Sequence, residues 1–222
     1  MKDEGGRMNN AREEMLGKVG AALKRTVDSE VATIPAMARS TSRVAGDAEF
    51  ELNAFLAEVE KLGGKTSRIA GLADLHGALR ELVEAEAIKK ATVWQTAELK
   101  AWGVEDTLKS IGVEVVSPYA PHRDVAECDL GITGADFALP ETGTLGLRSA
   151  IDQPRTVSLL PRVHLALIRP TCLRADLHQV FEEAKQAGYF VFVTGPSRTA
   201  DIELTVTVGV HGPKTLAVWV MP

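Results

Sequence analysis

One acidic side chain, Glu141, lies in a run of small and hydroxyl residues that suits a catalytic or ligand-binding turn. Thr142-Gly143-Thr144 follows it directly, and Gly134 and Asp136 precede it by a few positions. Glycines permit tight turns whose backbone N–H groups face one small volume, and a carboxylate can lie in the same volume. We therefore take residues 129–148 as the candidate functional centre.

The two carboxylates of this centre are the candidate catalytic residues. Glu141 can serve as a general acid or base, or as a nucleophile toward an acyl group. It can equally accept hydrogen bonds from neighbouring N–H groups and only shape the turn. Asp136 follows a glycine by two positions, which is also typical of an Asx turn. The residues alone leave both interpretations open.

A second candidate loop follows an apolar, β-rich run that ends at Thr194. It contains Gly195, Ser197, Arg198 and Thr199, so hydroxyls and a guanidinium come close together. Such groups can hold a carboxylate or a phosphate. Alternatively, Arg198 pairs with an acid of its own loop, Asp201 or Glu203, and no ligand is involved.

A third candidate loop contains His211 and Gly212, followed by Pro213 and Lys214. Lys214 can add positive charge to an anion site. The simpler interpretation is an exposed turn whose polar residues need no function.

Several common sites are excluded by the motifs that the chain lacks. Neither G-x-x-x-x-G-K-[ST] nor a G-x-G-x-x-G after a strand occurs, and H-E-x-x-H is absent. The five histidines show no metal-ligand spacing, and Cys128 and Cys172 are far apart in the sequence. We predict no metal site and no cofactor held by this chain.

Composition is that of an ordinary globular protein. The chain has 222 residues, of which 45% are hydrophobic and 25% charged, with a formal net charge of −5. The negative balance argues against nucleic acid or an anionic membrane as the main partner. No apolar run approaches the roughly 18 residues of a membrane span, and no secretory signal is evident, so we expect a cytoplasmic protein.

Hydrophobic periodicity predicts an α/β fold. Residues 1–46 are predicted to form a helix at 11–26 and an exposed connection, and residues 47–222 one α/β domain. Short apolar strands alternate there with amphipathic helices, which indicates an open, mostly parallel sheet with helices on both faces. The predicted strands are 66–70, 91–95, 113–116, 130–133, 144–147, 156–160, 164–168 and a fully buried 189–194. A helix is predicted from 173 to 184, and a C-terminal β-hairpin from 204–210 and 215–220.

In open parallel sheets, ligands bind at the carboxyl ends of strands. The three candidate loops each follow a predicted strand. We therefore expect them to meet in one crevice, with Gly134, Thr142, Gly143, Thr144, Gly195, Ser197, Arg198, Thr199, His211 and Gly212 as ligand-binding residues.

Three long motifs resemble the LUD domain family, specifically its lactate-utilization protein C group. They are GITGADFALPETGTLGL, SLLPRVHLALI and GPSRTADIELTVTVGVHGPKTLAVWV, and the resemblance covers roughly residues 47–222. It implies a fold similar to the sugar-phosphate isomerase and CoA-transferase type. It also implies a role in oxidising L-lactate to pyruvate with two companion proteins that carry iron–sulfur centres.

The family signature falls on the three loops already described. One departure is Pro140, where the resemblance leads us to expect a small residue before Glu141. The chain is thus expected to be a cluster-free component that binds a small carboxylate, a phosphorylated ligand or a partner subunit at the crevice. Two alternatives are a stand-alone acyl-CoA transferase or phosphosugar isomerase-like enzyme using Glu141, and a structural or regulatory subunit.

Overall fold

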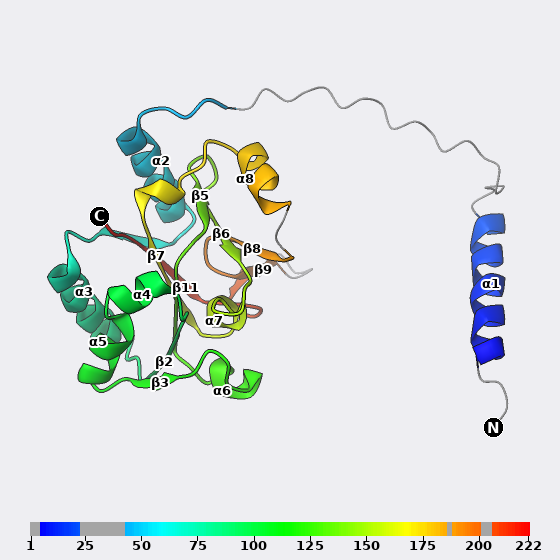
Figure 1. Cartoon of the computed structure of the whole chain (residues 1–222), viewed down its shortest axis with the longest axis horizontal. Helices are drawn as coiled ribbons and strands as arrows, with labels where there is room; N and C mark the ends of the chain where they lie inside the picture. The colour runs from blue at the N-terminus through cyan, green and yellow to red at the C-terminus, as the bar shows by residue number, and fades with distance from the viewer. Residues whose placement is uncertain (1–4, 23–42, 186–187, 201–205) are drawn as a thin grey trace. The chain divides into compact units, whose positions relative to one another are not determined.

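The computed structural model describes residues 5–22, 43–185, 188–200 and 206–222 (Figure 1). Contacts divide the chain into two units, residues 1–41 and 42–222. In the first unit, α1 spans Gly5–Ala22 and leaves Met15, Leu16 and Val19 exposed. The helix thus begins before the predicted 11–26, and residues 23–26 lie outside the described part.

The second unit is built around a six-stranded sheet in which every neighbouring pair is parallel. Two of its strands, β4 and β7, are buried along their whole length. This confirms the α/β class, because continuous apolar strands are typical of parallel sheets covered on both faces. In spatial order the strands are β1 (Lys65–Arg68), β11 (Thr215–Val220), β7 (Val163–Ile168), β4 (Leu130–Thr133), β2 (Lys90–Val93) and β3 (Glu114–Val116).

Helices cover this sheet from two sides. In Figure 1, α3, α4 and α5 lie to one side of the strands, whereas α6 and α7 lie to the other. Gly103, with φ +64°, separates α4 from α5, so this part of the chain forms two short helices. The bounds are α2 (Ala48–Lys61), α3 (Leu72–Ala85), α4 (Ala97–Ala101), α5 (Val104–Ser110), α6 (His122–Ala126) and α7 (Thr156–Leu159). Among the described residues, no helix is both long and apolar enough to cross a membrane.

A second, antiparallel sheet holds the candidate centre. Its order is β5 (Phe137–Leu139), β6 (Thr144–Arg148) and β8 (Phe190–Thr194). The prediction of a fully buried strand at 189–194 is wrong, because β8 is an edge strand of this small sheet and is partly exposed. Gly146 of β6 leaves room for the Phe137 ring, because a Cβ at that position would lie 1.7 Å from the ring.

Two further predictions were wrong in type or position. Residues 156–160 are not a strand, because α7 forms there and presses the Val157 carbonyl against β4. A Cβ at Gly131 would lie 1.9 Å from that oxygen, so the missing side chain makes room for the helical turn. The helix predicted from 173 is α8, Leu177–Ala184, preceded by a 3₁₀ turn at Pro170–Cys172. Asp176 caps α8 and accepts from the Gln179 N–H at 3.1 Å.

The hairpin expected near the C-terminus is present, with different strands. It is formed by β9 (Arg198–Ala200) and β10 (Val206–Val208), which pair antiparallel. The predicted second strand, 215–220, is β11 of the central sheet, where parallel pairing with β1 and β7 buries most of its side chains.

Candidate functional site

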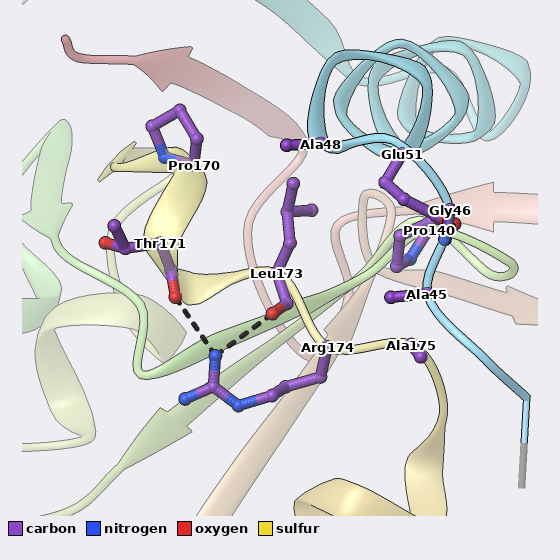
Figure 2. A pocket seen from close by; sticks show the side chains of 10 residues that line it. All are labelled: Ala45, Gly46, Ala48, Glu51, Pro140, Pro170, Thr171, Leu173, Arg174 and Ala175. Atoms are coloured by element: carbon purple, nitrogen blue, oxygen red, sulfur yellow. Dashed lines mark hydrogen bonds between the residues drawn. The ribbon is translucent and has the colours of Figure 1, made fainter.

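Two neighbouring hollows lie where the antiparallel sheet meets α2 and the segment after β7. Each has a volume of about 270 Å³, and Ala175 borders both. The first, the Pro170 hollow, is shown in Figure 2, where Arg174 donates to the Thr171 and Leu173 carbonyls at 3.0 Å each. The second, the Glu141 hollow, contains the predicted centre; its polar lining is Glu141, Thr142, Thr144, Asp176 and Thr194.

A row of three hydroxyl groups lines the Glu141 hollow. The Thr142 and Thr144 Oγ1 atoms are 2.8 Å apart, and the Thr144 and Thr194 Oγ1 atoms are also 2.8 Å apart. Each hydroxyl has one proton and two acceptor lone pairs, so the row retains capacity for a ligand. The Glu141 side chain is 58% exposed beside this row. Sequence reasoning found Glu141, Thr142 and Thr144 but missed Thr194.

Arg43 is the main residue that sequence reasoning missed. Its Nη2 donates to both Glu51 carboxylate oxygens, at 2.7 and 2.9 Å, and its Nη1 donates to the Ala175 carbonyl at 3.1 Å. Its backbone N–H donates to the Asp176 carboxylate at 2.6 Å. Its Nε lies 3.6 Å from Glu141 Oε1. One guanidinium thus connects the linings of both hollows.

Burial and charge set the ionisation of the two acids that hold Arg43. Burial alone would raise the pKa of Glu51, but the Gly46 N–H and the Arg43 guanidinium together outweigh it and lower the pKa. The Gln179 N–H lowers the pKa of Asp176, and the Arg43 backbone N–H adds to this effect. Both side chains are therefore carboxylates at neutral pH.

The segment before α2 is exposed at residues 44–47, and within residues 43–47 only Arg43 is partly buried. Arg43 is only 29% exposed at its side chain. A sequence signal for this contact existed, because Glu51 lies on the same helical face as Phe55 and is buried with it. An acid on a buried helical face requires a partner, and the arginine eight residues earlier supplies it.

Two predicted ligand-binding glycines, Gly143 and Gly195, allow close packing. Gly143 has φ +59°, and a Cβ there would lie 2.8 Å from the Val59 nitrogen of α2. Gly195 has φ +78°, and a Cβ there would lie 3.0 Å from Leu62 Cβ. Both turns therefore lie against the C-terminal half of α2 or its C-cap residue Leu62.

The third loop joins them through the backbone. The Ser197 N–H donates to the Pro213 carbonyl at 2.9 Å, and the Gly209 N–H donates to the Ser197 carbonyl at 2.9 Å. Gly212 lies against Ser197, since a Cβ there would be 3.2 Å from Ser197 Cβ. The third loop therefore contacts the second, and the second lies beside the first through the pairing of β6 with β8.

The remaining residues of the second and third loops have separate positions. Arg198 donates to the Leu62 carbonyl at the C-terminal end of α2 and is exposed. Thr199 pairs with Thr207 in the β9–β10 hairpin, and His211 is exposed. The predicted alternative partners of Arg198, residues 201 and 203, lie outside the described residues.

Asp136 and Gly134 lie apart from the Glu141 hollow. Asp136 accepts from the Arg148 backbone N–H at 2.7 Å and from its Nη2 and Nε at 2.7 and 3.1 Å. This bidentate pair ties the start of β5 to the end of β6. Gly134 follows β4, with the Leu167 carbonyl 3.7 Å from where a Cβ would be. The contacts of Asp136 form a cross-strand ion pair with Arg148 and not a local Asx turn.

Other titratable groups are buried in the core. Burial raises the pKa of Cys128 to about 11 and that of Cys172 to about 12, so both remain thiols at neutral pH. Burial lowers the pKa of His164 to about 4, and its Nε2 lies 2.8 Å from Thr133 Oγ1. Over the described ranges, no group of three acid, histidine or cysteine side chains is placed to hold a metal ion.

Comparison with known families decides the assignment. The LUD domain profile matches residues 52–221. The chain belongs to the LUD domain family. The Lactate utilization protein C of Shouchella clausii is 32% identical over 149 residues, and that of Halalkalibacterium halodurans is 33% identical over 150. Each match covers 63% of this chain and 65% of the relative, just under two thirds of its length.

The fold of this LUD domain has a solved counterpart. A DUF162 family protein from Deinococcus radiodurans superimposes with a TM-score of 0.61 at 20% identity, covering 80% of this chain and all of that one. This likeness supports the architecture alone. Together with the parallel sheet it confirms the predicted fold class, and the profile match confirms the family resemblance.

The charges of the Glu141 hollow restrict what it can bind. Glu141 and Asp176 contribute two carboxylates, whereas the Arg43 guanidinium beside Glu141 already pairs with Glu51. Carboxylate and hydroxyl oxygens accept hydrogen bonds. The arrangement therefore suits a ligand group that donates hydrogen bonds, and a free carboxylate would meet like charge.

Proposed function

We propose that this LUD domain is a component of a lactate-utilization system that oxidises L-lactate to pyruvate. The names of its relatives support the proposal, and the LUD domain match at residues 52–221 includes the Glu141 loop. The chain has two cysteines, and both are buried with raised pKa values. An iron–sulfur cluster needs several thiolates, so we assign the electron-carrying centres to companion proteins.

The Glu141 hollow is the proposed working site. The observation that carries this step is a half-exposed carboxylate at the rim of a three-hydroxyl row, in a hollow fixed by Arg43. Its acceptor groups would hold a hydroxyl of the substrate or an N–H of a companion subunit. Glu141 would orient that donor or take its proton. L-Lactate is itself an anion, so its hydroxyl would enter the hollow while its carboxylate would point away from Glu141 and Asp176.

A second candidate function is acyl transfer by Glu141. Among the described residues, the only contact recorded for its carboxylate is Arg43 Nε at 3.6 Å, which leaves the oxygens accessible. A carboxylate oxygen would attack a thioester carbonyl, the thiolate would leave, and a mixed anhydride would form on Glu141. Incubation with an acyl-CoA followed by mass spectrometry tests this. An adduct at Glu141 would support transfer, and an unmodified chain would exclude it.

Binding measurements test the proposed site. The chain is mixed with its companions, L-lactate, pyruvate, a phosphosugar and CoA in turn, and stabilisation is measured by thermal shift. Glu141→Gln should lose the response, whereas Glu81→Gln, a change at an exposed acid of α3, should keep it. Companion binding that survives Glu141→Gln with no ligand response would instead identify a structural or regulatory subunit.

A further inference from the structure

Two exposed aromatic side chains lie next to each other on α8 and β8. Phe181 is 52% exposed and Phe192 is 42% exposed. A hollow of about 420 Å³ lies between α8 and β8 and is lined by Phe181, Phe190 and Phe192. The ring centroids of Phe181 and Phe192 are 6.5 Å apart. A contiguous apolar surface of this kind is typical of an interaction site.

The strand beside this surface has an unpaired edge. Within the described residues β8 pairs only with β6. The Ser149 N–H donates to the Tyr189 carbonyl at 3.0 Å, which sets the alternation of the antiparallel ladder. It follows that Val191 and Val193 direct their main-chain groups to β6. The N–H and C=O groups of residues 190, 192 and 194 point to the open edge.

We propose that β8 pairs antiparallel with β8 of a second copy of this chain, about a two-fold axis at Phe192. In this register Phe192 lies opposite its own copy, and Phe190 lies opposite Thr194. All three are residues whose main-chain groups face the edge, so each pair exchanges two hydrogen bonds. The two three-stranded sheets then form one continuous sheet.

The strand itself favours a second copy as the occupant. Its sequence, FVFVT, carries no charge, so two copies meet without repulsion. Around the axis Val191 lies opposite Val193 and Phe190 opposite Thr194, and the second copy repeats each contact, as in any isologous contact. Long, apolar, uncharged edges are usually covered in native proteins, and nothing in this strand blocks pairing.

The size of the contact indicates a weak dimer. At roughly 200 Å² per aromatic side chain and about half exposure, two such side chains from each copy offer on the order of 400 Å². With the paired main chain, the contact stays below the roughly 1,200 Å² of stable interfaces, in the range of weak, transient ones. We expect a dissociation constant in the micromolar range. The second copy would also border the Glu141 hollow, because Phe192 and Thr194 line it.

Cysteine cross-linking tests the register directly. Phe192→Cys places two thiols opposite each other at a Cα separation that a disulfide tolerates. Both native cysteines are buried, so only the introduced thiol should form an intermolecular disulfide. Mild oxidation of the full chain should give a covalent dimer with Phe192→Cys and monomer with Phe50→Cys, a change at an exposed aromatic of α2. Equal cross-linking of the two variants would overturn the proposal.

Sedimentation equilibrium provides an independent test. The full chain should change from monomer to dimer over a roughly hundredfold range of concentration. Phe192→Lys places two like charges opposite each other and should weaken association at least about tenfold. Phe50→Lys should leave it unchanged. A chain that stays monomeric throughout, or a dimer that Phe192→Lys does not weaken, would refute the pairing. Neither test depends on the lactate role.

Discussion

Replacing Arg43 by alanine should destabilise the domain far more than the loss of a surface ion pair. The Glu51 side chain is 5% exposed, and its carboxylate depends on Arg43 and on the Gly46 N–H at 2.7 Å. Removing one partner of a buried ion pair costs 3–5 kcal/mol, and the partial exposure of Arg43 places this case at about 3 kcal/mol. For a domain of this size, that corresponds to a fall in Tm of about 6–12 °C.

The pH dependence of this effect distinguishes a charge effect from lost packing. In the native chain the pKa of Glu51 is lowered. The contribution of this carboxylate to the free energy of unfolding is therefore complete above the ordinary pKa of 4.5 and is lost as the pH falls below that value. In Arg43→Ala, the guanidinium no longer offsets the effect of burial on Glu51, so the pKa of Glu51 rises. The difference in unfolding free energy should therefore be full at pH 7 and shrink as the pH falls through about 4.5.

Urea unfolding at several pH values measures the difference. Arg68→Ala is the control, because Arg68 pairs with Glu49 on the surface and should cost under about 1 kcal/mol. The double variant Arg43→Met, Glu51→Leu should be less destabilised than the sum of the two single changes. A loss below about 1 kcal/mol for Arg43→Ala, or a loss that does not vary with pH, would refute the reasoning.

Three further predictions concern the core and the turns. Gly143→Ala should destabilise the domain by about 2 kcal/mol or more in thermal melts, because Gly143 has a positive φ and the α2 backbone lies 2.8 Å from the new Cβ. The control Gly77→Ala, in open space on α3, should be neutral or stabilising in the same melts. Thiol reagents should not label Cys128 or Cys172 at pH 7 until the chain unfolds, because burial raises both pKa values; rapid labelling of the native chain would contradict this. His164 should titrate near pH 4 in the native chain, as measured by NMR. The free energy of unfolding should fall between about pH 6.5 and pH 4, because in that range only the unfolded state takes up the proton. A native-state pKa near 6.5 would contradict this.

Much of the central sheet could be predicted from the sequence, because its strands are short apolar runs between amphipathic helices. Residues 130–133 form β4 as predicted, and β7 differs from its prediction by one residue. These strands are buried on both faces, so local composition and final environment agree. The Glu141 turn was found for a similar reason, since its glycine and threonine pattern is local.

The errors arose where long-range contacts override local pattern. The run at 156–160 has the composition of a strand. It forms α7 instead, and Gly131 of β4, which has no side chain, leaves room for the Val157 carbonyl. The run at 190–194 is apolar because of aromatic contacts, with Phe137 and Phe192 centroids 5.7 Å apart, and not because it lies in the central sheet. Hydrophobicity alone does not distinguish these cases.

Arg43 could not be found from spacing alone. Its contacts reach Glu51, Glu141 and Asp176, which lie in three different parts of the chain. Only the folded arrangement brings these acids to one guanidinium. The same holds for Thr194, which joins the hydroxyl row through antiparallel pairing of β6 and β8.

The most direct test of the central claim is the rate of L-lactate oxidation by the reconstituted companions as this chain is titrated in. The account predicts that the rate rises to a plateau with the native chain and with Glu81→Gln. With Glu141→Gln, whose thermal stability should be unchanged, the rate should remain at the level without the chain. Equal rates with the native chain and Glu141→Gln, or a rate independent of the chain, would contradict the account.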